Sequence, residues 1–149
     1  LAAASAAPMY LPTHKTQNNQ WMIDGSIVTN NPSLIGYSLA SKHYKDEDIS
    51  ILSIGTGVNS LSIDGKTSSK WGGVGWLRND IMGMMLDSEI DNDVAHNILG
   101  DSYLRINSSY GKINKFLDDD SEENIERIHL MGMEWWDMFG EKTIEFIEH

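Results

Sequence analysis

Short apolar segments typical of β-strands alternate along the chain with segments that have the spacing of helices. Residues 49–54 and 103–106 have the length and composition of strands, whereas residues 32–44 and 76–98 carry apolar residues at helical intervals. Alternation of this kind is typical of α/β domains, in which helices connect the strands of a mostly parallel sheet. The sequence therefore predicts an α/β fold with a mostly parallel sheet.

The first third of the chain adds one further strand and two loops. Residues 21–23, Trp-Met-Ile, form an apolar run short enough for a buried strand. Residues 9–20 and 58–70 are rich in polar residues, Pro or Gly, and are predicted to be loops. The Ala-rich residues 1–7 resemble the end of a helix. We therefore expect residues 1–149 to be the C-terminal part of a single domain.

Two apolar groups lie on predicted helices in the second half of the chain. An acidic run at residues 118–121 precedes a long helix whose apolar stripe includes Ile125, Trp135 and Phe139. A second group contains Trp76 with the Met-rich residues 82–86. Methionine commonly fills irregular gaps in a core, but an apolar lining is also what a pocket for an acyl chain requires.

Composition excludes several classes of partner and site. The net charge is −11, from 11 basic and 22 acidic residues, which argues against nucleic acid and gives no overall attraction to an anionic membrane. The absence of cysteine excludes disulfides and thiolate metal sites. No apolar run has the roughly 18 residues that a membrane span requires. A peripheral contact with lipid remains open.

The dipeptide Asp24-Gly25 allows two interpretations. Asp-Gly between apolar residues favours the tight turn of a β-hairpin, in which residues 26–29 would pair with residues 20–23. However, Asn30 and Pro32 form a helix-start signal only six to eight residues after Asp24, with Asn30 as the expected cap. A strand–turn–helix connection fits the same residues and would place Asp24 at the carboxyl end of a strand, where open α/β folds carry their sites.

A series of motifs resembles the patatin family in order and spacing. The most distinctive lie at residues 5–12, 23–26, 30–32 and 53–57, and weaker ones at 70–72, 103–106 and 118–127. The similarity extends to about residue 130. The resemblance implies a three-layer α/β/α patatin-like domain, of which this chain would be the C-terminal portion. It also favours the catalytic interpretation of Asp24.

The resemblance further implies hydrolysis of acyl esters of phospholipids or related lipids by a Ser-Asp dyad, without a metal or an organic cofactor. The aspartate of the family motif corresponds to Asp24, supported by Gly25, Ser26, Asn30 and Pro32. Ser26 stands where the family prefers Gly or Ala. Because burial disfavours the charged carboxylate and makes it a stronger base, we expect Asp24 to be partly buried. In either interpretation, Gly25 is expected to need a positive φ or a close backbone approach.

The family's nucleophile, a serine in a G-x-S-x-G elbow, has no counterpart in this sequence. Gly100-Asp101-Ser102-Tyr103-Leu104 shares the beginning of that pattern but lacks the final Gly. The oxyanion loop of the family is missing as well. We therefore expect the serine to lie upstream of Leu1, and the 149-residue chain alone to be inactive.

The remaining motifs of the sequence are less specific. Residues 53–57 end in Gly-Thr-Gly, which lacks the spacing of a phosphate loop and indicates a tight strand exit. His14 is the histidine closest in sequence to Asp24, but no motif surrounds it. The competing function is a non-catalytic lipid- or partner-binding module on the same fold. For the enzyme we expect a lipid substrate and a cytoplasmic or peripheral-membrane location, and the sequence does not indicate an oligomeric state.

Overall fold

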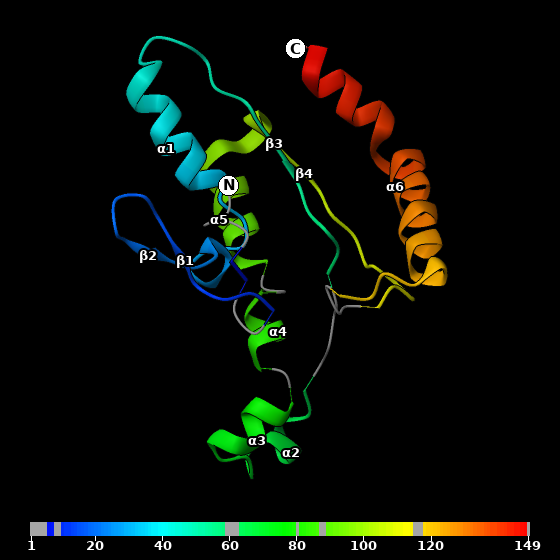
Figure 1. Ribbon diagram of the computed structural model, residues 1–149. Helices are drawn as coiled ribbons and strands as arrows, with labels where there is room; N and C mark the ends of the chain where they lie inside the picture. Colours follow the sequence, from blue (N-terminus) through cyan, green and yellow to red (C-terminus); the bar gives the residue numbers. More distant parts are fainter. Residues whose placement is uncertain are drawn as a thin grey trace. The chain divides into compact units, whose positions relative to one another are not determined.

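The computed structural model describes residues 6–7, 10–58, 63–79, 81–86, 89–114 and 118–148 (Figure 1). The chain divides into two compact units. One unit combines residues 1–30 with residues 112–149, and the other comprises residues 31–111. Each unit is built from different helices and strands.

The unit of residues 31–111 is built on two parallel strands. Strands β3 (Ile51–Ile54) and β4 (Tyr103–Ile106) pair in register, Ile51 with Tyr103 and Ile54 with Ile106. Helices α1 (Ser33–His43) and α5 (Ile90–Leu99) contact each other, and they pack on β3 and β4 respectively. Helical segments connect the two parallel strands in sequence, which confirms the predicted α/β fold.

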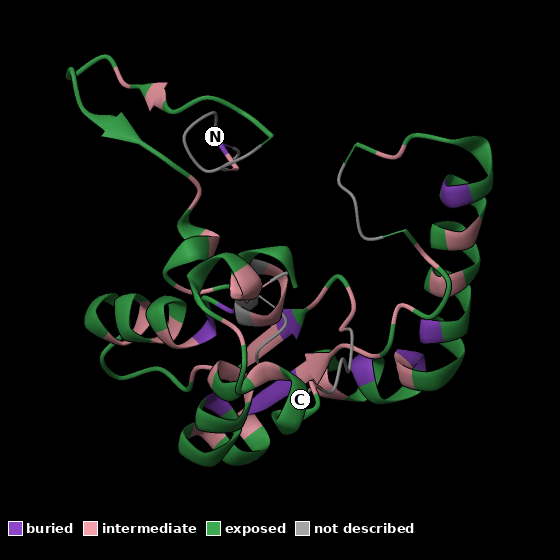
Figure 2. Ribbon diagram, turned by 90° about the horizontal axis from the view of Figure 1, so that it is seen from below, coloured by how far each residue is buried: buried purple, intermediate pink, exposed green. Residues whose placement is uncertain are grey.

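Helix α5 faces β4 with small and polar residues. Ala95 is fully buried, whereas the apolar residues Ile90, Val94 and Ile98 are 69%, 41% and 61% exposed. Figure 2 colours the ribbon by how far each described residue is buried. The four-residue spacing correctly predicted a helix but not the side that packs. Ala95 permits close approach of α5 to the strand, so the larger residues of the helix point away from it.

Further short helices follow β3. They are α2 (Gly65–Ser68), α3 (Gly73–Arg78), α4 (Ile81–Leu86) and the 3₁₀ helix η2 (Gly100–Ser102). The prediction of an uninterrupted loop at residues 58–70 is wrong for α2. Asp64 caps this helix, since its Oδ2 accepts from the amide of Thr67 at 2.9 Å and from its hydroxyl at 2.7 Å. That cap initiates a helix within a polar segment.

The other unit begins with a small antiparallel hairpin. Strand β1 (His14–Lys15) pairs with β2 (Trp21–Met22), and the amide of Thr16 donates to the carbonyl of Gln20 at 2.8 Å. Two predictions are therefore wrong, namely a loop over all of residues 9–20 and a buried strand at residues 21–23. Trp21 is 67% exposed. Strands β1 and β2 form a two-stranded sheet, and among the described residues no third strand pairs with it.

Helix α6 (Glu122–Glu148) starts in a capping network that the acidic run predicted correctly. The Ser121 hydroxyl accepts from the amide of Asn124 at 3.3 Å, as an N-cap residue does. The buried Asn124 side chain accepts from the amide of Asn114 at 2.9 Å and donates to the carbonyl of Asp119 at 3.1 Å. These bonds connect the segment that precedes the helix to its first turn.

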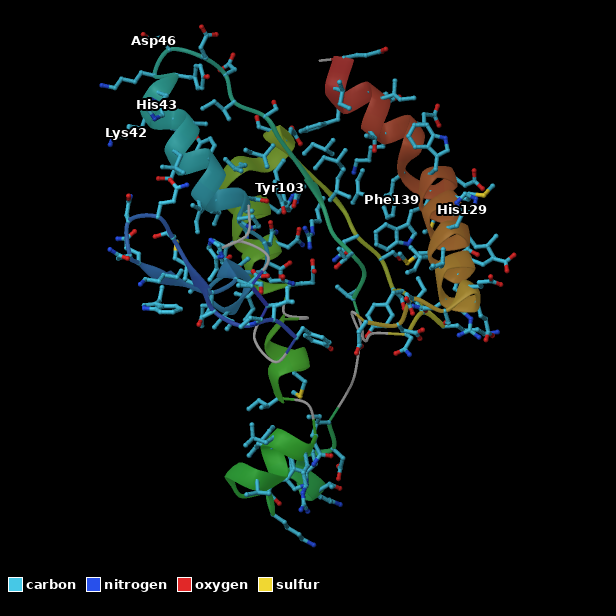
Figure 3. All side chains as sticks on the ribbon, in the orientation of Figure 1. Lys42, His43, Asp46, Tyr103, His129 and Phe139 are labelled. Atoms are coloured by element: carbon cyan, nitrogen blue, oxygen red, sulfur yellow. The ribbon has the colours of Figure 1, made fainter. Side chains whose placement is uncertain are left out.

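The predicted apolar stripe of α6 is only partly buried. Trp135 is buried and meets Phe139 edge to face, with ring centroids 6.5 Å apart (Figure 3 labels Phe139). Ile125 and Ile128, at the start of the same stripe, are 55% and 45% exposed. The burial of the stripe is therefore concentrated in the middle and later part of the helix.

The start of α6 should be sensitive to acid through Asp119. Hydrogen bonds from the side chain and amide of Ser121, then from Asn114, hold the pKa of Asp119 below its usual value of 3.8. A lowered folded-state pKa stabilises the unit above the unfolded value, and this contribution is lost as pH falls through the folded value. We expect Ser121→Ala to move the titration midpoint of Asp119 upward, as measured by carboxyl-carbon NMR. An unchanged midpoint would contradict the assigned cause.

The exit of β3 requires glycine at position 57. Gly57 has φ of +108°, and a Cβ there would lie 2.6 Å from the Cβ of Tyr110. Gly57→Ala should therefore lower the free energy of unfolding by about 2 kcal/mol or more, measured by urea denaturation. Gly36→Ala is the matched control, since its Cβ would meet nothing within 4 Å inside α1. That change should stabilise the protein by about 0.5–1 kcal/mol, and equal losses for both variants would refute the steric argument.

Candidate active site

Asp24 lies in a turn that leads into a short helix. Its carboxylate Oδ1 accepts from the amide of Ser26 at 2.8 Å, which caps the 3₁₀ helix η1 (Gly25–Ile27). The amide of Val28 donates to the carbonyl of Gly25 at 2.9 Å. Because β2 pairs with β1 rather than with residues 26–29, the hairpin interpretation of Asp24-Gly25 is wrong.

The Asp24 side chain is half-buried, as the sequence predicted. Its amide donates to the carbonyl of Ala6 at 3.1 Å, which fixes the backbone that carries it. The apolar residues next to Asp24 in sequence are open to solvent, since Trp21 is 67%, Ile23 44% and Ile27 39% exposed. Among the described residues, the bond from Ser26 is the one recorded at the carboxylate, so Oδ2 has an open acceptor position there.

Gly25 does not have the conformation expected for it. Positive φ values occur at other described glycines, and a Cβ on Gly25 would meet no atom within 4 Å. The reason is that Gly25 begins a right-handed 3₁₀ helix, which any residue can enter. Neither a positive φ nor a close backbone approach therefore explains this glycine.

The helix-start signal is confirmed, but Asn31 makes the capping contact recorded there. Helix α1 begins directly after Pro32, and the Oδ1 atom of the buried Asn31 accepts from the Ser33 amide at 3.3 Å. The same oxygen accepts from the hydroxyls of Ser33 and Ser53, at 2.5 Å and 3.2 Å. Asn30, the residue predicted as the cap, is exposed.

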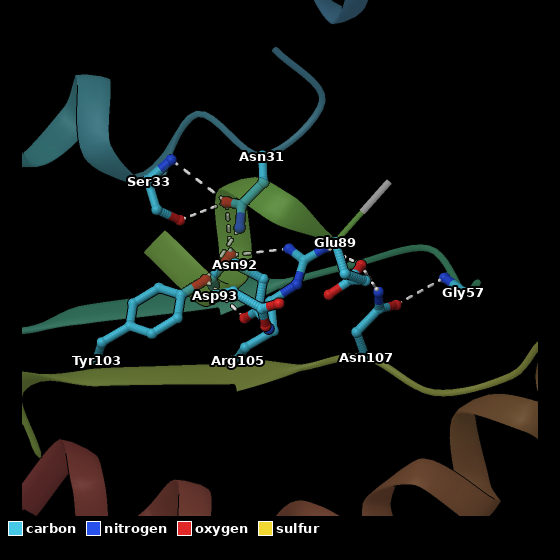
Figure 4. A network of polar contacts seen from close by, with 10 residues as sticks. Asn31, Ser33, Gly57, Glu89, Asn92, Asp93, Tyr103, Arg105 and Asn107 are labelled. Atoms are coloured by element: carbon cyan, nitrogen blue, oxygen red, sulfur yellow. Dashed lines mark hydrogen bonds and ion pairs between the residues drawn. The ribbon is translucent and has the colours of Figure 1, made fainter. Parts of the chain in front are cut away.

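Asn31 belongs to a buried polar network that joins four elements of its unit (Figure 4). Its Nδ2 donates to the phenolic oxygen of Tyr103 on β4 at 3.0 Å, and that hydroxyl donates to Oδ1 of Asn92 on α5 at 3.2 Å. Ser53 on β3 completes the group. The buried side chains of Asn31, Ser53 and Tyr103 thus gain hydrogen-bond partners, which offsets the cost of removing them from water.

A charged branch of this network runs along the exits of both strands. Arg105 donates from Nη1 to the Ser53 hydroxyl at 2.8 Å and lies 3.5 Å from Glu89 through Nη2. Asn107 donates to Glu89 at 2.8 Å and accepts from the amide of Gly57 at 3.0 Å (Figure 4). Residues 53–57 are therefore a tight strand exit, as predicted. Local spacing gave no indication of the network, because hydrogen-bonded partners within it are up to 72 positions apart in sequence.

Two G-x-S patterns lie in settings unsuited to a nucleophile elbow. Ser102 lies in η2, directly before β4. Gly36-Tyr37-Ser38-Leu39-Ala40, which the sequence reasoning overlooked, lies within α1. An elbow serine instead sits in a sharp turn from a strand to a helix. Neither serine has the context of a nucleophile.

The structure contains no cluster of metal ligands within the residues that it describes. His14, the histidine closest in sequence to Asp24, lies on β1. No helix within the described ranges is both long and apolar enough to cross a bilayer.

Of the Met-rich residues 82–86, which were predicted to line either the core or an acyl-chain pocket, Met84 is half-buried. The side chains of Met82, Met85 and Leu86 are not among those that the structure describes.

The fold and the turn define an α/β protein with a half-buried aspartate at the entry to a helical turn. Patatin-like protein 4 of Arabidopsis thaliana is 29% identical over 162 residues, which cover 86% of this chain and 40% of that protein. Patatin-like protein 1 of Oryza sativa subsp. indica is 31% identical, over 57% of this chain and 27% of that protein. Patatin-like protein 2 of the same subspecies is 27% identical, over 87% of this chain and 41% of that protein. No model of a known protein family matches the chain.

These similarities establish that the chain is related to the patatin-like proteins, which confirms the resemblance drawn from its motifs. The chain spans about two fifths or less of the length of these relatives.

Proposed function

We propose that this chain supplies the catalytic base, Asp24, of a lipid acyl hydrolase that acts through a Ser-Asp dyad. The observation that carries the proposal is the geometry of the Asp24 turn. The Ser26 amide fixes Oδ1, and Oδ2 keeps an open acceptor position among the described residues. A carboxylate held in this way can accept a proton from a serine hydroxyl without losing its orientation.

The reaction needs one proton acceptor and one nucleophile. As the serine Oγ attacks the acyl carbon, Asp24 takes the hydroxyl proton and later transfers it to the departing alcohol. Water then hydrolyses the acyl-serine intermediate with Asp24 acting as base again. Among the described residues beyond its chain neighbours, no atom lies within 4 Å of a Cβ placed on Gly25, so they do not crowd this side of the turn.

Lipid esters are the proposed substrates because of the relationship to patatin-like proteins. A peripheral contact with membranes and a cytoplasmic or membrane-surface location accord with this substrate class. The nucleophilic serine and the oxyanion donors are proposed to come from outside the present sequence. No metal or organic cofactor is required by a mechanism of this type.

The proposal is tested by measuring fatty acid released from phosphatidylcholine and from a p-nitrophenyl ester. The complete protein encoded by the gene should release fatty acid, whereas the 149-residue chain should not. The alternative function, a non-catalytic lipid- or partner-binding module, predicts a different result. In that case the complete protein would bind lipid vesicles and release no fatty acid from either substrate.

A further inference from the structure

The residues at 65–79, which contain α2 and α3 and are called here the α2–α3 segment, differ in charge from the rest of the chain. They include Lys66, Lys70 and Arg78 and no acidic residue, in a chain of net charge −11. All three basic side chains are exposed. Asp64 and Asp80 adjoin the segment in sequence, and the Asp64 carboxylate caps α2 through Thr67. With three basic and two acidic residues, residues 64–80 carry a net charge of +1 in a chain whose net charge is −11.

The same segment exposes apolar and aromatic side chains. Val74 and Leu77, three positions apart on α3 and hence on one side of it, are 65% and 69% exposed. Trp71 and Trp76 meet edge to face with centroids 5.1 Å apart, and both are half-buried. Gly75 permits this packing, because a Cβ there would lie 2.9 Å from the Cβ of Trp71.

We propose that the α2–α3 segment (α2 and α3 in Figure 1) docks on membranes that contain anionic lipids. Exposed aliphatic side chains gain from entering the acyl boundary, and tryptophan favours the level of the headgroups. Lysine and arginine keep their charges in the headgroup layer while their stems lie against apolar surface. The combination of Val74 and Leu77 with three cations matches such an interface in both its apolar and its charged parts.

Nucleic acid would use the cations but not the aliphatic residues, since its affinity comes from phosphate contacts and base stacking. The overall charge of −11 does not oppose docking by one segment. At physiological salt, charges more than about 8 Å apart in solvent are largely screened from each other. The attraction therefore depends on the charges close to the lipid surface, and the net charge of the whole chain does not measure them.

The test is co-sedimentation of the 149-residue chain with phosphatidylcholine vesicles, with or without phosphatidylserine. Binding is expected to the mixed vesicles and to weaken as salt is raised. The triple change Lys66→Gln, Lys70→Gln and Arg78→Gln should weaken binding about a hundredfold, or about fivefold for each cation. Val74→Ser with Leu77→Ser should weaken it about tenfold by removing the inserted apolar surface.

The matched control removes the same charge elsewhere, with Lys42→Gln, Lys45→Gln and Lys112→Gln, all at exposed positions. This control should bind as the unchanged chain does. No binding to mixed vesicles, equal losses in the control and the segment variant, or preferential binding to single-stranded DNA would overturn the proposal. Docking supplies the lipid surface for the proposed function, but the assay measures no hydrolysis, so the two proposals can fail separately.

Discussion

Asp24→Asn in the complete protein is expected to lower the rate of acyl-ester hydrolysis by about 10²–10⁴-fold. An amide cannot take the proton of a serine hydroxyl, so the nucleophile loses its base. The Asn side-chain oxygen can still accept from the Ser26 amide, which now holds Asp24 Oδ1 at 2.8 Å, so the turn should persist. The measurement is fatty acid release, with far-UV circular dichroism and urea unfolding to verify the fold.

Asp46→Asn provides the control for this change, since Asp46 is an exposed aspartate outside the proposed site. It should retain full activity. Reaction with a fluorophosphonate gives a second readout, because it reports on the reactivity of the serine itself. Labelling should slow in Asp24→Asn and not in the control. If Asp24→Asn kept most of the hydrolytic rate with an unchanged fold, the assignment of Asp24 as the base would be wrong.

Asn31→Ala is expected to lower the free energy of unfolding by about 3 kcal/mol, the second large effect. The change removes an acceptor from the Ser33 amide and the Ser53 hydroxyl, and a donor from Tyr103. A buried polar group left without a partner costs about 1–3 kcal/mol, and loss of a helix cap about 1 kcal/mol. Urea denaturation monitored by circular dichroism measures the difference.

Asn97→Ala is the corresponding control, because Asn97 is exposed on α5. It should change stability by no more than about 0.5 kcal/mol. A double-mutant cycle of Asn31→Ala with Tyr103→Phe should be non-additive by about 1 kcal/mol or more, since the two side chains share a hydrogen bond of 3.0 Å. Additive effects, or a loss below about 1 kcal/mol for Asn31→Ala, would contradict the role given to the network.

Strands and helix starts were predicted correctly where residues adjacent in sequence carry the whole pattern for them. The apolar segments at residues 49–54 and 103–106 correctly predicted strands β3 and β4, and the capping residues before α1 and α6 correctly predicted where these helices begin. The predictions from sequence were wrong where the pairing of strands or the packing of a helix decides the structure. The β1–β2 hairpin needs a partner strand within a polar segment, and the inward side of α5 depends on Ala95 rather than on its larger apolar residues.

At the candidate site, too, some features were predicted from the sequence and others were not. The motif series identified Asp24 and the patatin-like relationship, because a turn followed by a helix start leaves a recognisable local pattern. It assigned the helix cap to Asn30, whereas the capping bond recorded in the structure comes from Asn31. The difference is one position in sequence but depends on Ser53 and Tyr103, whose side chains hold the Asn31 amide group in place.

The sequence by itself determined the alternating elements, the acidic character, and the relationship that makes Asp24 the candidate base. These features follow from local patterns or from composition, neither of which requires knowledge of distant contacts. Tertiary structure alone decided that Asp24-Gly25 enters a 3₁₀ helix instead of closing a hairpin, and that Asn31, Ser53 and Tyr103 meet. The physical reason is that a turn with two allowed conformations, and polar groups far apart in sequence, take their final arrangement from the partners that folding brings to them.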